Sequence, residues 1–111
     1  MIKTVMYFGR GKRQADGYLN PVYVSAEQFE KFMVDVIGPR FPLGFTHVMA
    51  EGFWRYSSGN TMQEKTEIVV IIHGEQEEHA IKVDFIAEEY CLMFQQESVM
   101  LESSTVNVKF S

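Results

Sequence analysis

The residues best placed for chemistry are aromatic and acidic side chains on two consecutive predicted strands. Residues 52–56, Gly-Phe-Trp-Arg-Tyr, precede a loop containing Ser-Gly-Asn, and residues 63–67, Gln-Glu-Lys-Thr-Glu, follow it. Pairing of these segments as a hairpin would bring Trp54 and Tyr56 close to Glu64. Aromatic faces beside a carboxylate suit a ligand with a flat ring and a positive centre. The pattern therefore indicates a binding site for a cationic, ring-containing ligand.

The same hairpin also allows a purely structural interpretation. Aromatic residues on neighbouring strands often pair across a sheet, and Arg55 and Glu67 would then exchange charge at the surface. The sequence contains no Walker loop, no Gly-x-Ser-x-Gly elbow and no Cys-x-x-Cys motif. The residues alone therefore point to a site without specifying a reaction.

A glycine-flanked arginine follows the first predicted strand. Gly9-Arg10-Gly11 is half of a dinucleotide-binding fingerprint, and Lys12 and Arg13 extend it into a basic loop. This loop is predicted either to bind an anion through its backbone amides or to form a solvated turn.

Histidine and cysteine provide weaker candidates. His73 and His79 lie six residues apart across a predicted turn with three glutamates, and either hold a metal or belong to an acidic, solvated turn. Cys91 falls on the apolar face of a predicted helix and is expected in the core. We therefore expect no metal and no cofactor.

Composition excludes several classes of protein. The chain has 111 residues, of which 46% are hydrophobic and 14% aromatic, which is too apolar for a disordered chain. A formal net charge of −5 argues against a general nucleic-acid binder. The single cysteine favours a reducing compartment, and the short apolar N-terminus predicts neither a signal peptide nor a membrane span. We expect one cytoplasmic domain over residues 1–111.

The elements that must position these residues follow from periodicity. Ser25 and Gln28 form a capping box before a helix that we expect to end at Gly38-Pro39, and residues 75–94 predict a second helix. Strands are predicted at residues 2–8, 45–56 with a bulge at Gly52, 64–73, 98–101 and 106–110.

The order of these elements predicts an α+β fold. It is the ferredoxin-like βαββαβ sandwich, with an antiparallel sheet, both helices on one face and an extra C-terminal strand. Residues 68–72, Ile-Val-Val-Ile-Ile, are apolar on both faces of their strand. Either a second copy covers the open face or the strand is simply central, and we expect a homo-oligomer.

Two longer motifs and a glutamate resemble a family of small bacterial and phage proteins of unknown function. The motifs are the run of residues 39–46, Pro-Arg-Phe-Pro-Leu-Gly-Phe-Thr, and residues 52–55, Gly-Phe-Trp-Arg, with Glu64 after them. Residues 94–99, Phe-Gln-Gln-Glu-Ser-Val, also match this family where its helix leads into a strand. The resemblance implies a fold and a site, without an activity.

A more remote resemblance is to phage S-adenosylmethionine lyases. These proteins look like ferredoxin-like oligomers with a Gly-x-Tyr-Arg strand, a hairpin, and Glu-Lys-Thr opening the next strand, as at residues 52–55 and 64–66 here. The resemblance implies that Glu64 is catalytic. The lyase tyrosine falls on Trp54, so its hydroxyl would have to come from Tyr56. Trp54, Tyr56, Arg55 and Tyr7 are the predicted ligand-binding residues.

This resemblance implies a trimer with S-adenosylmethionine at a subunit interface, acting in the cytoplasm, or the host cytoplasm if the protein is phage-encoded. The alternative is a non-enzymatic binding or host-interaction module whose acidic surface mimics nucleic acid. That surface consists of Glu75, Glu77, Glu78, Glu88 and Glu89. A third interpretation, an oxygenase-like oligomer, lacks a histidine beside a carboxylate at the open sheet face.

Overall fold

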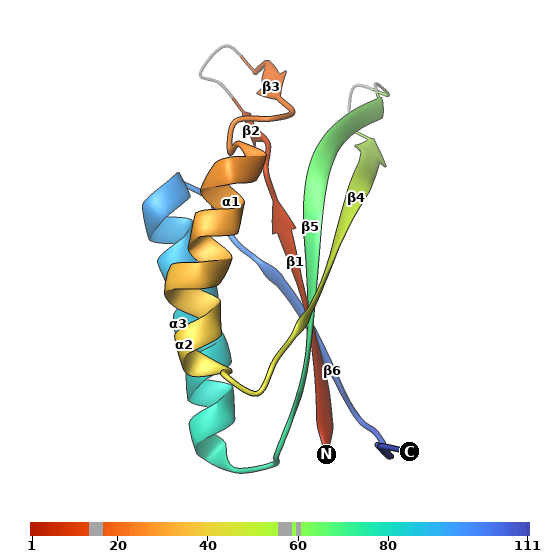
Figure 1. Ribbon diagram of the computed structural model, residues 1–111. Coiled ribbons are helices and arrows are strands. Elements are labelled where there is room, and N and C mark those ends of the chain that lie inside the picture. The colour runs from red at the N-terminus through yellow and green to blue at the C-terminus, as the bar shows by residue number, and fades with distance from the viewer. Residues whose placement is uncertain (14–16, 56–58, 60) are drawn as a thin grey trace.

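The computed structural model describes residues 1–13, 17–55, 59 and 61–111 (Figure 1). The main strands are β1 (Ile2–Gly9), β4 (Thr46–Arg55), β5 (Thr61–His73) and β6 (Met100–Thr105). A small hairpin, β2 (Lys12–Arg13) and β3 (Leu19–Asn20), follows β1. The helical segments are α1 (Ala26–Phe32), the π-helical η1 (Met33–Ile37), α2 (Gly38–Arg40) and α3 (Glu77–Phe94).

The four main strands form one antiparallel sheet in the order β4-β5-β1-β6. The continuous helix formed by α1, η1 and α2 lies beside α3, and both cover the same face of the sheet (Figure 1). In chain order the strands are the second, third, first and fourth, which is the ferredoxin-like arrangement. The predicted fold class is therefore confirmed.

The β4–β5 hairpin has a regular register. Each residue of β4 has one partner on β5, from Thr46 opposite Val70 to Arg55 opposite Thr61. The predicted bulge at Gly52 is wrong, because a bulge needs an extra unpaired residue and Gly52 simply lies opposite Glu64.

The first helix begins where the sequence predicts. The Ser25 hydroxyl accepts a hydrogen bond from the Gln28 amide at 3.0 Å, and the Gln28 side chain accepts one from the Ser25 amide at 2.8 Å. The predicted end at Gly38-Pro39 is wrong, because the helix continues to Arg40. In η1 the Gly38 amide donates to the Met33 carbonyl five residues back, and this wider turn accommodates Pro39, which has no N–H to donate.

An aromatic cluster joins the helices to the sheet. Phe8 of β1 packs edge-to-face against Phe29, Phe32 and Tyr90, with ring centroids 5.2, 5.8 and 4.9 Å away. All four side chains are at least 99% buried. The cluster fixes α1 and α3 on β1 and so positions the loop that follows Gly9.

The C-terminal end differs from the prediction. The Ser-Ser-Thr segment at residues 103–105 belongs to β6, and residues 106–111 form no strand. The predicted extra C-terminal strand is therefore wrong. The physical reason is that β6 pairs with β1, and this ladder ends where Thr105 meets Ile2, the first residue of β1.

The two faces of the sheet have different environments. On β5, Val69 and Ile71 are fully buried beneath the helices, whereas Ile68 and Val70 lie on the open face and are partly exposed. Val48 of the neighbouring strand is 50% exposed on that same open face. That a second copy covers this face stays a prediction. Among the described residues, no helix is long and apolar enough to cross a membrane.

Candidate functional site

Glu64 lies in a hollow of about 370 Å³ at the end of the sheet where β1 runs into the β2–β3 hairpin. The hollow is bordered on its other side by the segment that connects α3 to β6. Its lining residues are Gly11, Lys12, Leu19, Glu64, Gln95, Gln96, Glu97 and Ser98. The volume falls in the range of small-molecule pockets.

The two glycines around Arg10 bring the backbone against the carboxylate of Glu64. The Gly11 amide donates a hydrogen bond to Oε2 at 2.7 Å. A Cβ added at Gly9 would lie 2.7 Å from Oε1, and one at Gly11 would lie 2.4 Å from Oε2. Of the backbone amides in this loop, that of Gly11 therefore binds a carboxylate of the same protein. Binding of an external anion by the loop stays a prediction.

Burial and hydrogen bonding act in opposite directions on Glu64. Burial raises the pKa of the carboxyl group above its usual value, and the hydrogen bond from Gly11 opposes the rise only in part. A carboxylate kept partly out of water attracts a cation more strongly than one on the open surface. Glu64 can therefore act as an anchor for a positive group or as a proton acceptor.

Replacing Gly11 by alanine tests this close approach. We expect Gly11→Ala to lower the free energy of unfolding by about 1–3 kcal/mol, because its Cβ would also lie 3.0 Å from the Asn20 carbonyl. Gly38→Ala is the matched control. Its Cβ would lie 3.4 Å from its nearest neighbour, in a helical conformation, so we expect an unchanged or higher stability. Urea unfolding measures both, and equal effects would contradict the close approach.

Polar contacts hold the rim of the hollow. Lys12 donates a hydrogen bond to the Gln95 side chain, and its ammonium group lies 4.9 Å from the centre of the Tyr23 ring. The side-chain Nε2 of Gln96 donates to the Gly11 carbonyl at 3.0 Å. Gln95 adopts a left-handed conformation with φ of 54°, which is uncommon for a residue with a side chain. Lys12 and Glu64 thus place opposite charges in one hollow.

The structure separates the other predicted ligand-binding residues from Glu64. The Tyr7 hydroxyl donates to Glu102 of β6 at 2.7 Å, and this hydrogen bond raises the pKa of the phenol. Arg55 lies opposite Thr61, three positions along β4 from the Gly52–Glu64 pair and on the alternate face. The proposed exchange of charge with Glu67 therefore does not occur.

Trp54 and Tyr56 are placed only in part. Trp54 pairs with Met62 through the backbone, two residues from the pair formed by Gly52 and Glu64. This register agrees with the predicted proximity of the two strands. The Trp54 side chain and all of Tyr56 lie outside the described residues.

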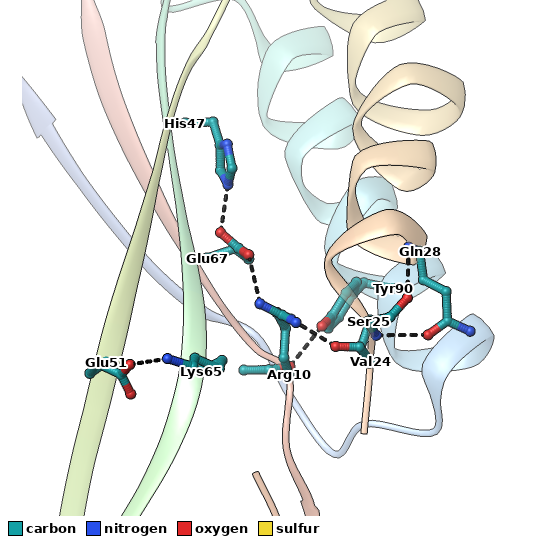
Figure 2. Close-up of polar contacts among 10 residues, drawn as sticks. Arg10, Val24, Ser25, Gln28, His47, Glu51, Lys65, Glu67 and Tyr90 are labelled. Atoms are coloured by element: carbon teal, nitrogen blue, oxygen red, sulfur yellow. Dashed lines mark hydrogen bonds and ion pairs between the residues drawn. The ribbon is translucent and has the colours of Figure 1, made fainter. Parts of the chain in front are cut away.

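A buried ionic relay supports the loop that holds Glu64 (Figure 2). The Arg10 guanidinium donates through Nη1 to Oε1 of Glu67 at 3.2 Å and through Nε to the Val24 carbonyl at 2.7 Å. The other Glu67 oxygen lies 2.5 Å from Nε2 of His47. The side chains of Arg10 and Glu67 are 7% and 2% exposed. The relay fixes Arg10, the residue between the two glycines.

The backbone around the relay is tied down as well. The Arg10 amide donates to the Lys65 carbonyl at 2.9 Å, its own carbonyl accepts from Val24 at 2.8 Å, and the Tyr90 hydroxyl donates to the Gly9 carbonyl at 2.7 Å (Figure 2). Burial is the main cause that raises the pKa of Tyr90, so this phenol stays a hydrogen-bond donor.

Sequence reasoning missed the relay, although a signal for it exists. Glu67 alternates with Val69, Ile71 and His73, which all point beneath the helices. A carboxylate at a position that periodicity assigns to the core must have a buried partner. That partner is Arg10, 57 residues away in sequence.

His73 and His79 belong to a small cluster of aromatic rings. Among the described residues no three His, Cys, Asp or Glu side chains are grouped to hold an ion. His73 and His79 instead stack near each other, with ring centroids 5.5 Å apart, and both contact Phe41. Cys91 is partly buried, and burial raises the pKa of its thiol, which makes it a poor nucleophile.

Comparisons with known proteins agree with this fold. The model of a family described as "Protein of unknown function (DUF3574)" matches residues 3–110. No curated protein matches the chain. A phage SAM lyase in complex with S-methyl-5'-thioadenosine has 20% identity and a TM-score of 0.65, over 93% of this chain and 79% of the lyase.

Two further solved structures are similar to this chain in fold. The phage SAM lyase in the apo state has 21% identity and a TM-score of 0.65, over 93% of this chain and 78% of the lyase. A variant of CutA1 from Pyrococcus horikoshii OT3 has 14% identity and a TM-score of 0.52, over 99% of this chain and 87% of CutA1. At these identities the likeness shows the fold.

Proposed function

This chain belongs to the DUF3574 family, and we propose that it cleaves S-adenosylmethionine as a carbon–sulfur lyase in the hollow around Glu64. One observation carries the proposal: a half-buried carboxylate, held by a backbone amide, faces a hollow of about 370 Å³. Such a carboxylate matches a substrate that carries a sulfonium and an ammonium group. The likeness of the fold to a phage SAM lyase supports the choice of this substrate.

The proposed reaction needs no nucleophile from the protein. The substrate's own carboxylate oxygen attacks its γ-carbon, a carbon–oxygen bond forms, and the bond from this carbon to sulfur breaks. The electron pair stays on sulfur, which gives methylthioadenosine, and the other product is homoserine lactone. Because the sulfonium is a good leaving group, the protein has only to fold the substrate into attack geometry. Such orientation can lower the activation free energy by several kcal/mol, about 7–11 for the best-oriented reactions.

The charged side chains of the hollow take complementary roles in this proposal. Glu64 binds the ammonium group and favours the cationic substrate, while Lys12 faces the substrate carboxylate and limits its motion. Stacking on the adenine or contact with the sulfonium is the role that the sequence predicts for Trp54 and Tyr56, and each such contact would be worth about 0.5–2 kcal/mol. The hydrogen bond between Lys12 and Gln95 holds the lysine at the rim before substrate arrives.

Tyr7 belongs to the proposal only through a second copy, and Arg55, which lies on the other face of the sheet, is left out of it. Tyr7 lies on the open face of the sheet, bound to Glu102 rather than to Glu64. In a homo-oligomer, for which we favour a trimer, the open face of one protomer would bring Tyr7 to its partner's hollow. Light scattering of the purified protein tests this arrangement, and a monomer at all concentrations would remove Tyr7 from the site.

The direct test is to incubate purified protein with S-adenosylmethionine and to separate the products by chromatography. We expect methylthioadenosine and homoserine lactone to appear faster than in buffer alone, and S-adenosylhomocysteine, which lacks the sulfonium charge, to bind more weakly in calorimetry. Heat without product would overturn the lyase and leave a sensor or sequestering module. If calorimetry shows no heat and chromatography shows no product, S-adenosylmethionine is excluded both as substrate and as ligand.

A further inference from the structure

A second cavity, of about 410 Å³, lies at the opposite end of the sheet from Glu64. It forms where the chain passes from α2 into β4 and where β5 ends before α3, at the lower end of the view in Figure 1. Part of its wall is residues 40–44, Arg-Phe-Pro-Leu-Gly. These belong to the run that resembles a small-protein family most specifically, and the proposed lyase reaction makes no use of them.

The charges around this cavity have one sign. The cations Arg40 and Lys82 line it together with His73 and His79, and its described lining residues include no aspartate or glutamate. This contrasts with a chain that has 15 acidic and 10 basic residues overall. The Glu78 carboxylate is 3.9 Å from Nε2 of His79 and 69% exposed, so water screens it. The cavity is therefore a local positive site on an acidic protein.

The walls between these charges are flat and apolar. Phe41 is only 6% exposed, and the ring of His79 stacks on it with centroids 6.2 Å apart and an angle of 27° between planes. Leu43, by contrast, is fully exposed at the edge of the cavity. A planar ligand would cover Leu43 and lie next to the stacked rings of Phe41 and His79.

The side chains of Arg40 and His73 are held in place before any ligand binds. Arg40 donates through Nη1 to the Val36 carbonyl at 2.9 Å, and its guanidinium lies 3.9 Å from the centre of the Phe85 ring. Nδ1 of His73 donates to the Gly74 carbonyl at 2.8 Å, and its Nε2 shares a hydrogen bond with the Thr4 hydroxyl at 2.7 Å. Preorganised groups of this kind lose little entropy on binding.

One polar atom in this cluster lacks a partner. Nδ1 of His79 is the buried side-chain nitrogen or oxygen that makes no hydrogen bond within the described part of the chain. Buried polar atoms without partners are rare in folded proteins and call for an explanation such as a ligand or a water molecule.

We propose that this cavity binds an organic anion, a carboxylate or phosphate ester attached to a flat apolar body. Arg40 and Lys82 neutralise the anion, His79 donates or accepts a hydrogen bond, and Phe41 and Leu43 contact the apolar part. The site lies at the far end of the sheet from Glu64, so it stands whether or not the protein cleaves S-adenosylmethionine.

Nuclear magnetic resonance titration with phenyl phosphate and benzoate tests the site, with benzyl alcohol as the neutral probe. We expect both anions to cause chemical-shift changes at residues 41–44 and 79. Benzyl alcohol should bind at least tenfold more weakly than either anion. The anion that binds more tightly shows whether the site prefers a phosphate or a carboxylate. Lys82→Gln should weaken anion binding about three- to tenfold. Shifts located elsewhere, or equal binding of the alcohol, would overturn the proposal.

Two variants keep this experiment interpretable. Lys31→Gln removes an exposed lysine of α1, 78% exposed and paired with Asp35, and should leave anion binding unchanged. Leu43→Ser removes apolar contact without touching a charge or a buried group, and should weaken phenyl phosphate but not inorganic phosphate. If Lys82→Gln and Lys31→Gln have equal effects, the binding reflects overall charge and the site does not exist.

Discussion

Replacing Glu64 by glutamine is expected to slow the release of methylthioadenosine at least about 100-fold, which corresponds to about 2.7 kcal/mol of transition-state stabilisation. Glutamine preserves the shape of the side chain and can still accept the hydrogen bond from Gly11. It removes the charge that would hold the cationic substrate. The measurement is initial rate by chromatography, with the rate in buffer subtracted.

Stability measurements separate this loss from unfolding. Because burial raises the pKa of Glu64 in the folded protein, ionising it costs stability. That cost begins as pH rises through the ordinary glutamate range and is complete above the raised value, so at neutral pH Glu64→Gln should unfold at an equal or higher urea concentration. Glu88→Gln, on the exposed side of α3, should leave the rate unchanged. If Glu64→Gln keeps a third of the activity, the carboxylate does not carry the reaction.

The same raised pKa predicts how the wild-type rate depends on pH. If the ionised carboxylate binds the substrate, activity falls on acidification as Glu64 is protonated. The midpoint of this fall in kcat/KM should lie above about 4.3, the usual value for glutamate, because burial raises the pKa of Glu64. A midpoint at or below the usual value would contradict the assignment to Glu64.

Replacing Glu67 by glutamine is expected to lower the free energy of unfolding by about 3–5 kcal/mol. The substitution leaves the Arg10 guanidinium, only 7% exposed, without its charged partner, and it also removes the negative charge beside His47. Breaking one side of a buried pair costs more than the pair contributes as a whole, since the remaining charge stays out of water. Urea unfolding followed by circular dichroism gives the value.

Two controls identify burial as the cause. Glu51→Gln breaks the surface pair with Lys65 and should cost much less stability than Glu67→Gln. In the double variant Arg10→Met with Glu67→Leu, both charges are absent, and we expect it to recover part of the loss. A cost below about 1 kcal/mol for Glu67→Gln would mean that water reaches the relay.

The helical and strand segments of this protein were predictable because their signals are local. The capping box at Ser25 lies within four residues, and the apolar spacing of Phe29, Phe32 and Val36 lies within three turns. The order of these segments then leaves few sheet arrangements, which is why the ferredoxin-like fold could be predicted. The prediction failed where two local effects compete. At Pro39 the missing N–H is expected to end the helix, but a π turn just before it lets the helix continue to Arg40.

The candidate site was predictable only in outline. The hairpin register that places Trp54 within two residues of the Gly52–Glu64 pair follows from pairing two adjacent strands. The role of Gly9 and Gly11 does not, because the carboxylate they hold comes from more than 50 residues away. The sequence predicts Tyr7 as a ligand-binding residue because it is aromatic. In the folded sheet, however, β6 lies beside β1 and the Tyr7 hydroxyl donates its hydrogen bond to Glu102.

The sequence by itself therefore determined most of the elements and the fold class, whereas the central role of Glu64 stays a prediction. Only the tertiary structure decided that Arg10, Glu67 and His47 form one buried relay, and that Arg40, His79 and Lys82 surround one cavity. The physical reason is the range of the interactions. Propensity and periodicity act between near neighbours along the chain. Ionic and cavity contacts depend on distances in space, which are fixed when helices and sheet pack together.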